Sequence, residues 1–183
     1  MATTNNQPFL TDVKELRRRA REQMDKGAVT QDYGLDAEQA VAVLQSALAT
    51  EIVCVLRYTM HSIAATGINS QGAKDEFAQH AEEEKGHMEQ IAERINQLGG
   101  TPNFSPEGLA SRSASEYGKQ ELDLVGMIKE NLVAERIAIE HYRELIAYFG
   151  EKDSTTRTML EEILAVEEEH ANDMADLLSA HAG

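Results

Sequence analysis

Six side chains of this 183-residue sequence have the types and the spacing to bind metal ions. They form two copies of one pattern, in which a single glutamate precedes a Glu-x-x-His pair by 33 residues (84 − 51) or 32 residues (167 − 135): Glu51, Glu84 and His87, then Glu135, Glu167 and His170. Residues at positions i and i+3 of a helix share one face, so each pair would present a carboxylate beside an imidazole. Such mixed oxygen and nitrogen ligands suit iron or manganese, with zinc possible and copper a poorer match.

The charge of these residues also favours a metal site. A Glu-x-x-His pair arises easily by chance in a chain this rich in glutamate, so the pairs alone are weak signals. However, all four glutamates interrupt helix faces that are otherwise apolar, where unpaired carboxylates would be costly to bury. No Lys or Arg lies at the same level of these faces. Two divalent cations would balance the four carboxylates and leave two neutral imidazoles as ligands.

The elements that must position these residues are helices. Apolar side chains recur at intervals of three and four residues, which is typical of a buried helix face, along four segments: 36–65, 71–98, 119–149 and 153–180. No segment alternates with a period of two, so no strand is predicted. The predicted fold class is all-α, with a four-helix bundle over 36–183 and an N-terminal extension over 1–35 that contains a short helix at 11–27.

Composition narrows the classes of partner. The net charge of −15 disfavours nucleic acid and anionic membranes as partners and is compatible with attracting cations. The basic stretch within 11–27 holds six basic and four acidic residues, so DNA binding is not expected. The most apolar segment, 40–56, contains Glu51 and is predicted to be too short and polar to span a membrane. A single cysteine, Cys54, and no evident signal peptide fit a cytoplasmic protein.

Together these residues resemble the ferritin superfamily, and most closely bacterioferritin and the Dps-like mini-ferritins. The resemblance extends over about 36–178 and rests on four segments: LATEIVCVLRYTMH (48–61), EEEKGHMEQIAERINQLGGTPNF (82–104), LVAERI (132–137) and EEILAVEEEH (161–170). It implies a ferritin-like bundle with a ferroxidase centre of two iron ions per chain. Such a centre oxidises Fe(II) with dioxygen or hydrogen peroxide, and the Fe(III) is stored as mineral inside a protein shell.

The resemblance also implies a role for each residue. Glu84 and Glu167 would bridge both metals. The terminal ligands would be two carboxylates and two imidazoles, each on one metal: Glu51, Glu135, His87 and His170. Tyr58 lies seven residues after Glu51, where the family has a tyrosine beside the centre, and it is the expected catalytic side chain. Two alternatives stay open: a soluble di-iron oxidase or di-manganese catalase on the same ligands, and a helical scaffold without metal.

Two departures from bacterioferritin shape further expectations. Bacterioferritin binds haem through a methionine directly after the bridging glutamate of its second helix, and here that position is Lys85, so haem is not expected. Only 13 residues follow His170 (183 − 170), too few to finish the fourth helix and build a fifth. A homo-oligomeric shell of twelve subunits is therefore expected rather than the larger shell of 24.

Several nearby residues are expected to stand outside the centre. We expect His80 to be a surface or hydrogen-bonded histidine, with assistance to metal entry as the alternative, and His141 to point away from the metals. His181 should lie in a fraying tail, and Cys54 should be a small buried side chain. Four further glutamates are expected to face solvent: Glu82, Glu83, Glu168 and Glu169.

Overall fold

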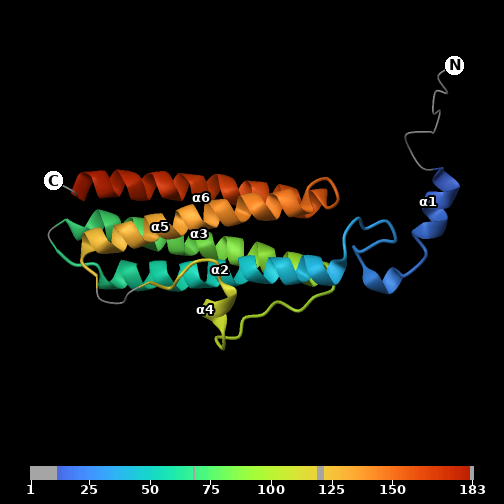
Figure 1. The fold of residues 1–183 in the computed structure, drawn as a ribbon, viewed down its shortest axis with the longest axis horizontal. Coiled ribbons are helices and arrows are strands. Elements are labelled where there is room, and N and C mark those ends of the chain that lie inside the picture. The colour runs from blue at the N-terminus through green and yellow to red at the C-terminus, as the bar shows by residue number, and fades with distance from the viewer. Residues whose placement is uncertain (1–11, 68, 119–121, 182–183) are drawn as a thin grey trace, which may run out of the picture.

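Four long helices form the body of the molecule. The computed structural model describes residues 12–67, 69–118 and 122–181. The long helices, which lie side by side in Figure 1, are α2 (Ala37–Ala64), α3 (Ser70–Gln97), α5 (Leu124–Phe149) and α6 (Ser154–His181). The short elements are α1 (Val13–Arg19), the 3-10 turn η1 (Met24–Lys26) and α4 (Leu109–Arg112). These described ranges contain no strand, which confirms the predicted all-α class.

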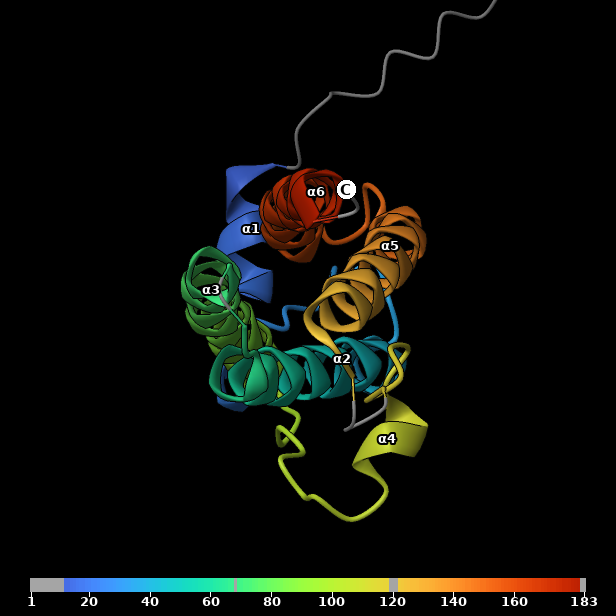
Figure 2. The ribbon, with the colours of Figure 1, turned by 90° about the vertical axis from the view of Figure 1, so that its left-hand side faces the viewer.

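The helices are connected as two antiparallel hairpins. α2 packs along α3, and α5 packs along α6, while one long connection over 98–123 joins the two hairpins (Figures 1 and 2). This connection runs the length of the bundle, and its short helix α4 contacts α2. A bundle with a single long crossover is one of the known four-helix topologies. Because the sequence pattern repeats from one hairpin to the other, equivalent glutamates are brought to the same level.

Local sequence signals explain where the long helices begin and end. Asp36 caps α2 by accepting the backbone N–H of Gln39 at 2.9 Å, and Gly99 follows α3 with a φ of +84°. The predicted start of the third helix at 119 is wrong, because α5 begins at Leu124. There Asp123 accepts the N–H of Gly126 at 2.8 Å, and residues 119–121 lie outside the described ranges.

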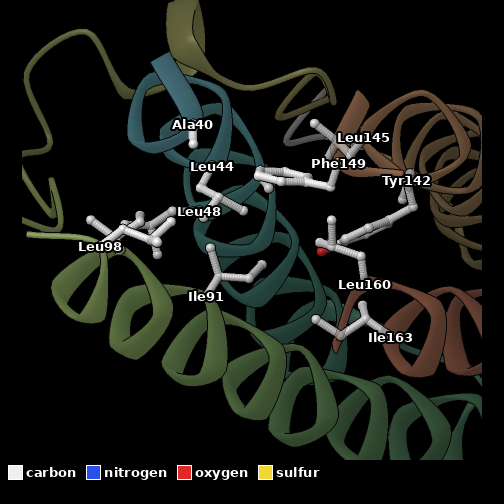
Figure 3. Close-up of a cluster of buried hydrophobic side chains, with 13 residues drawn as sticks. Ala40, Leu44, Leu48, Ile91, Leu98, Tyr142, Leu145, Phe149, Leu160 and Ile163 are labelled. Atoms are coloured by element: carbon white, nitrogen blue, oxygen red, sulfur yellow. The ribbon is translucent and has the colours of Figure 1, made fainter. Parts of the chain in front are cut away.

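The bundle has two apolar clusters with a polar level between them. Figure 3 shows the cluster near the start of α2, where side chains from both hairpins meet around Leu44, Tyr142 and Leu160. The cluster at the opposite end includes Phe77 and Met174. Burial of these side chains is the main favourable contribution to folding. The buried glutamates and histidines of the four helices lie between the two clusters.

The N-terminal segment is less regular than the sequence predicts. The single helix expected at 11–27 is instead α1 followed by η1, and neither element buries a residue. Short helices without tertiary packing are marginal, which explains the early end of α1. Further on, the Tyr33 hydroxyl donates to Asp153 at 2.8 Å and ties the linker to the start of α6. The domain boundary at 35/36 stays a prediction.

α2 is also long and apolar enough to cross a membrane by length and composition alone. This criterion is met by the whole 28-residue helix and not by the segment 40–56 alone. Half of its most apolar window is buried inside the bundle, as in the core helix of a folded domain.

Candidate metal centre

The structure brings all six predicted ligands to one buried level of the bundle. The four glutamates are fully buried, His87 is 5% exposed and His170 is 1% exposed. Their ligand atoms fall into two groups, each with all atoms within 4.8 Å of one another: Glu51, Glu84, His87 and Glu167, and then Glu84, Glu135, Glu167 and His170. Glu84 and Glu167 belong to both groups. The arrangement therefore has room for two neighbouring metal ions that share two carboxylates, and the metal-binding role of the six residues stays a prediction.

Both imidazoles direct Nδ1 at the carboxylates. His87 Nδ1 lies 2.8 Å from a Glu167 oxygen and 3.5 Å from a Glu84 oxygen. His170 Nδ1 lies 3.6 Å from Glu84, while its Nε2 pairs with Glu83 at 2.8 Å. A histidine that binds metal through one nitrogen commonly has a carboxylate at the other, which fixes its orientation. Glu83 was expected to face solvent, and its side chain is 39% exposed while it also pairs with His170; Glu82, Glu168 and Glu169 are exposed as expected.

The atoms that face the middle of this cluster have no hydrogen-bond partner among the described residues. They are eight buried atoms: Glu51 Oε2, both carboxylate oxygens of Glu84, Glu135 Oε2, both carboxylate oxygens of Glu167, and Nδ1 of His87 and of His170. Buried polar atoms are nearly always paired, and each unpaired one costs about 1–3 kcal/mol. So many convergent unpaired ligand atoms fit a pair of cations between them.

The pKa values of the four buried carboxyl groups indicate that the cluster lacks compensating positive charge. Burial and the charge of Glu84 raise the pKa of Glu51 to about 8. The same two causes raise the pKa of Glu135, and they hold the pKa of Glu167 well above its usual value. Glu84 differs: burial opposes its ionisation, but the neighbouring imidazoles of His170 and His87 outweigh burial and lower its pKa. Without metal, the cluster is therefore neutralised by protons.

The two imidazoles hold some of these protons. Burial opposes protonation of His87, but the neighbouring carboxylates, that of Glu167 foremost, outweigh burial and raise its pKa to about 12. For His170, burial is likewise outweighed by the neighbouring carboxylates of Glu84 and Glu135, and the pKa rises to about 9. Both histidines would have to lose a proton to bind a metal ion.

Two tyrosines complete the repeat. The Tyr58 hydroxyl on α2 donates to Glu135 on α5, and the Tyr142 hydroxyl on α5 donates to Glu51 on α2. Each tyrosine follows the glutamate of its own helix by seven residues (58 − 51 and 142 − 135). Tyr142 was not among the site residues predicted from the sequence. The repeated spacing was the signal that could have identified it.

A buried cation close to the centre does not neutralise it. Arg57, 1% exposed, donates from Nε to Asn131 at 3.0 Å and from Nη1 to the backbone carbonyl of Glu116 at 2.7 Å. Its Nη2 lies 3.4 Å from the sulfur of Cys54, which is buried as expected. Arg57 therefore fixes the long connection against α2 and forms no ion pair with the carboxylates among the described residues.

The other histidines differ in their surroundings. His80 is fully buried and its Nδ1 lies 3.2 Å from the Tyr58 hydroxyl, so it is a hydrogen-bonded histidine and not a surface one. His141 is half-buried and contacts Ser46 at 3.2 Å, outside the ligand groups. His181 ends α6 with Nδ1 2.8 Å from the backbone carbonyl of Leu177, so the described part of the tail continues the helix.

A hollow between α3 and α6 connects the centre with the surface. It measures about 300 Å³ and is lined mainly by polar side chains, including His87 and His170 from the centre and Glu83, Glu169 and Asp173 nearer solvent. A larger hollow of about 580 Å³ lies along α5, where Val133 and Ile137 are among its lining residues, and it includes none of the six ligands. The acidic hollow between α3 and α6 is therefore the opening through which cations would reach the centre.

Comparisons with known proteins agree with this architecture. Residues 41–181 match the family described as the ferritin-like domain. The chain is 30% identical over 148 residues to the DNA protection during starvation protein of Pyrococcus furiosus, covering 80% of each. It superposes with a TM-score of 0.78 on the bacterioferritin-related protein from Bacteroides fragilis, described as a dodecameric thioferritin, at 33% identity over 81% of this chain and 89% of that one. A ferritin-like, diiron-carboxylate protein from Bacillus anthracis gives a TM-score of 0.68 at 26% identity, over 78% and 96% of the two chains.

Proposed function

This chain belongs to the ferritin-like domain family, and we propose that it stores and detoxifies iron by oxidising Fe(II) at the buried centre. The observation that supports this most directly is the set of eight unpaired ligand atoms that converge from four helices. Two ferrous ions held side by side can deliver two electrons to one molecule of dioxygen or hydrogen peroxide. The similarity to a diiron-carboxylate protein supports iron as the metal.

The six residues would act as two bridging and four terminal ligands of the two ions. Glu84 and Glu167 belong to both groups of ligand atoms, which suits carboxylates that bridge two metals. Each of the remaining four ligands belongs to only one of the two four-residue groups, so they would be terminal: Glu51, His87, Glu135 and His170. Tyr58 and Tyr142 hold the two terminal carboxylates in place through their hydrogen bonds. Such positioning lowers the reorganisation that the oxidation step requires.

We further propose that twelve chains form a closed shell in which the oxidised iron collects. The Bacteroides fragilis relative is described as dodecameric, and closed symmetric assemblies are the rule among homo-oligomers. The charge of −15 per chain would make such a particle attractive to cations. Light scattering should give about twelve times the chain mass of 20.2 kDa. A stable monomer or dimer would contradict storage and favour an oxidase or catalase on the same ligands.

Stopped-flow oxidation of Fe(II) tests the assignment of the centre. Glu84→Gln preserves the size of the side chain but removes a bridging charge, so it should abolish rapid oxidation while the helical content is retained. The matched control is Glu82→Gln, which removes an exposed charge two residues earlier on the same helix. Wild-type rates in Glu84→Gln would rule out this ligand set. Equal losses in both variants would show that the effect does not come from the centre.

A further inference from the structure

We propose that Glu76, His80 and Asp173 form a further divalent-cation site beside the buried centre. Glu76 and His80 lie one turn apart on α3, and Asp173 lies on α6 three residues after His170. One ligand atom from each of the three side chains lies within 4.8 Å of the other two. None of the three belongs to the six residues assigned to the di-metal centre, so the proposal holds whether or not that centre oxidises iron.

The first argument is the unpaired nitrogen of His80. The side chain is fully buried, and its Nε2 makes no hydrogen bond to any described residue although it points at two carboxylates. Nε2 lies 3.2 Å from Glu76 Oε1 and 3.5 Å from Asp173 Oδ2. A buried nitrogen left without a partner costs free energy that a bound cation would recover.

The contact that Nδ1 of His80 makes indicates which ring nitrogen is available to a cation. His80 Nδ1 contacts the Tyr58 hydroxyl, and that hydroxyl already donates its only hydrogen to Glu135. The phenol oxygen can therefore only accept, so Nδ1 carries a proton and donates it to that oxygen. Nε2 is then the ring nitrogen that faces the two carboxylates and is available to a cation. A cation between them turns three mutually repelling groups into three ligands.

The carboxylates lack any other compensating charge. Within the described ranges neither Glu76 nor Asp173 lies within ion-pair distance of a lysine or arginine. Burial, followed by the charges of Asp173 and Glu83, raises the pKa of Glu76. The acidic groups here thus repel one another, and a divalent ion would relieve that repulsion.

The surroundings indicate an open site that exchanges its ion. The side chain of Glu76 is 31% exposed and that of Asp173 is 41% exposed, so water can complete the coordination. Both side chains line a hollow of about 300 Å³ that continues past Asp176. Two carboxylates and one imidazole suit Fe(II), Mn(II) or Zn(II). With three protein ligands, this site should bind its ion more weakly than the centre.

The site is next to the centre as well as open to solvent. The ring of His80 stacks on the ring of His170 with centroids 3.9 Å apart. Asp173 also lines the hollow between α3 and α6 that leads to His170. An ion at this position would therefore lie on the approach to the pair of metal positions.

Zinc serves as the probe because it binds such ligands and is not oxidised. Metal-free wild-type protein is titrated with Zn(II) by calorimetry, and zinc positions are located by anomalous diffraction in crystals. The test variant is Glu76→Gln with Asp173→Asn, which removes two half-exposed carboxylates. The control is Glu89→Gln with Glu162→Gln, which removes the same charge from exposed positions on the same two helices.

We expect about three zinc ions per chain in the wild type and the control, and about two in the test variant, with the third anomalous peak against His80 Nε2. Wild-type protein with no peak at His80, or a test variant that keeps this peak, would overturn the proposal. A failure of the di-metal centre looks different, because the two peaks between Glu84 and Glu167 would be missing while the peak at His80 remains.

Discussion

Metal binding to the buried centre should release protons, because several ligands hold protons in the metal-free protein. Three of the ligands are protonated at pH 7 in the metal-free protein: His87 with a pKa of about 12, His170 with a pKa of about 9, and Glu51 with a pKa of about 8. A group with a pKa one unit above the pH is about nine-tenths protonated, and the two histidines are almost fully protonated. All three must lose their protons to bind metal, so loading should release about three protons per pair of ions, and any proton held by Glu167, whose pKa is also well above its usual value, would add to this number.

Calorimetric titration with Zn(II) measures this release directly. The observed enthalpy is recorded in buffers of different ionisation enthalpy, and its slope against that enthalpy gives the number of protons. At about three protons, the product of the two binding constants should also rise about a thousandfold per pH unit near pH 7. His170→Gln should lower the release to about two protons per pair of ions.

The control for this experiment is His141→Gln. Burial lowers the pKa of His141, so it holds no proton to release at pH 7, and it lies outside the ligand groups. The release should therefore stay at about three protons in this variant. Fewer than about one proton in the wild type would refute the reasoning, because the ligands would then be ionised before the metal arrives.

Further predictions concern stability, the tyrosine and haem. His170 holds its proton more tightly in the folded metal-free protein than in the unfolded chain, so its protonation stabilises the fold. This contribution to the free energy of unfolding is fully present below pH 6.5 and is lost as the pH rises through about 9. Urea unfolding of metal-free protein should show falling stability over this range, and a rise would contradict the shift. Tyr58→Phe removes the hydroxyl that donates to Glu135 and should slow Fe(II) oxidation about tenfold, the equivalent of one hydrogen bond. The number of zinc ions bound should not change. The control, Tyr148→Phe, should leave the oxidation rate unchanged. Because Lys85 stands where bacterioferritin has its haem methionine, protein expressed with ample haem should show no Soret band, and a stoichiometric band would show that another residue binds haem.

The bundle and the level of its polar residues were predictable because helical periodicity and charge act locally along the chain. The three- and four-residue spacing identified all four long helices, and the interruptions of the stripes identified the six buried side chains. The boundary of α5 was missed because the capping by Asp123 competes with a helical pattern that begins earlier. The extent of α1 was missed because a short helix depends on packing that the sequence does not reveal.

The residues around the six ligands were harder to predict, because their roles depend on contacts between helices. Glu83 stands in a run of three glutamates, and only the position of His170 on another helix shows that this partly exposed side chain also pairs with a ligand. His80 was expected outside the centre, yet its stacking on His170 places it beside the ligands. The role of Arg57 could not be predicted either, because its partners Asn131 and Glu116 are distant in sequence.

The proposed di-metal centre is tested most directly by anomalous diffraction from crystals soaked with Fe(II) without oxygen. The proposal predicts two iron peaks per chain, both bounded by carboxylate oxygens of Glu84 and Glu167, with His87 Nδ1 against one peak and His170 Nδ1 against the other. A single peak, or an empty centre with iron only at surface carboxylates, would contradict a pair of metal positions and with it the proposed oxidation of Fe(II).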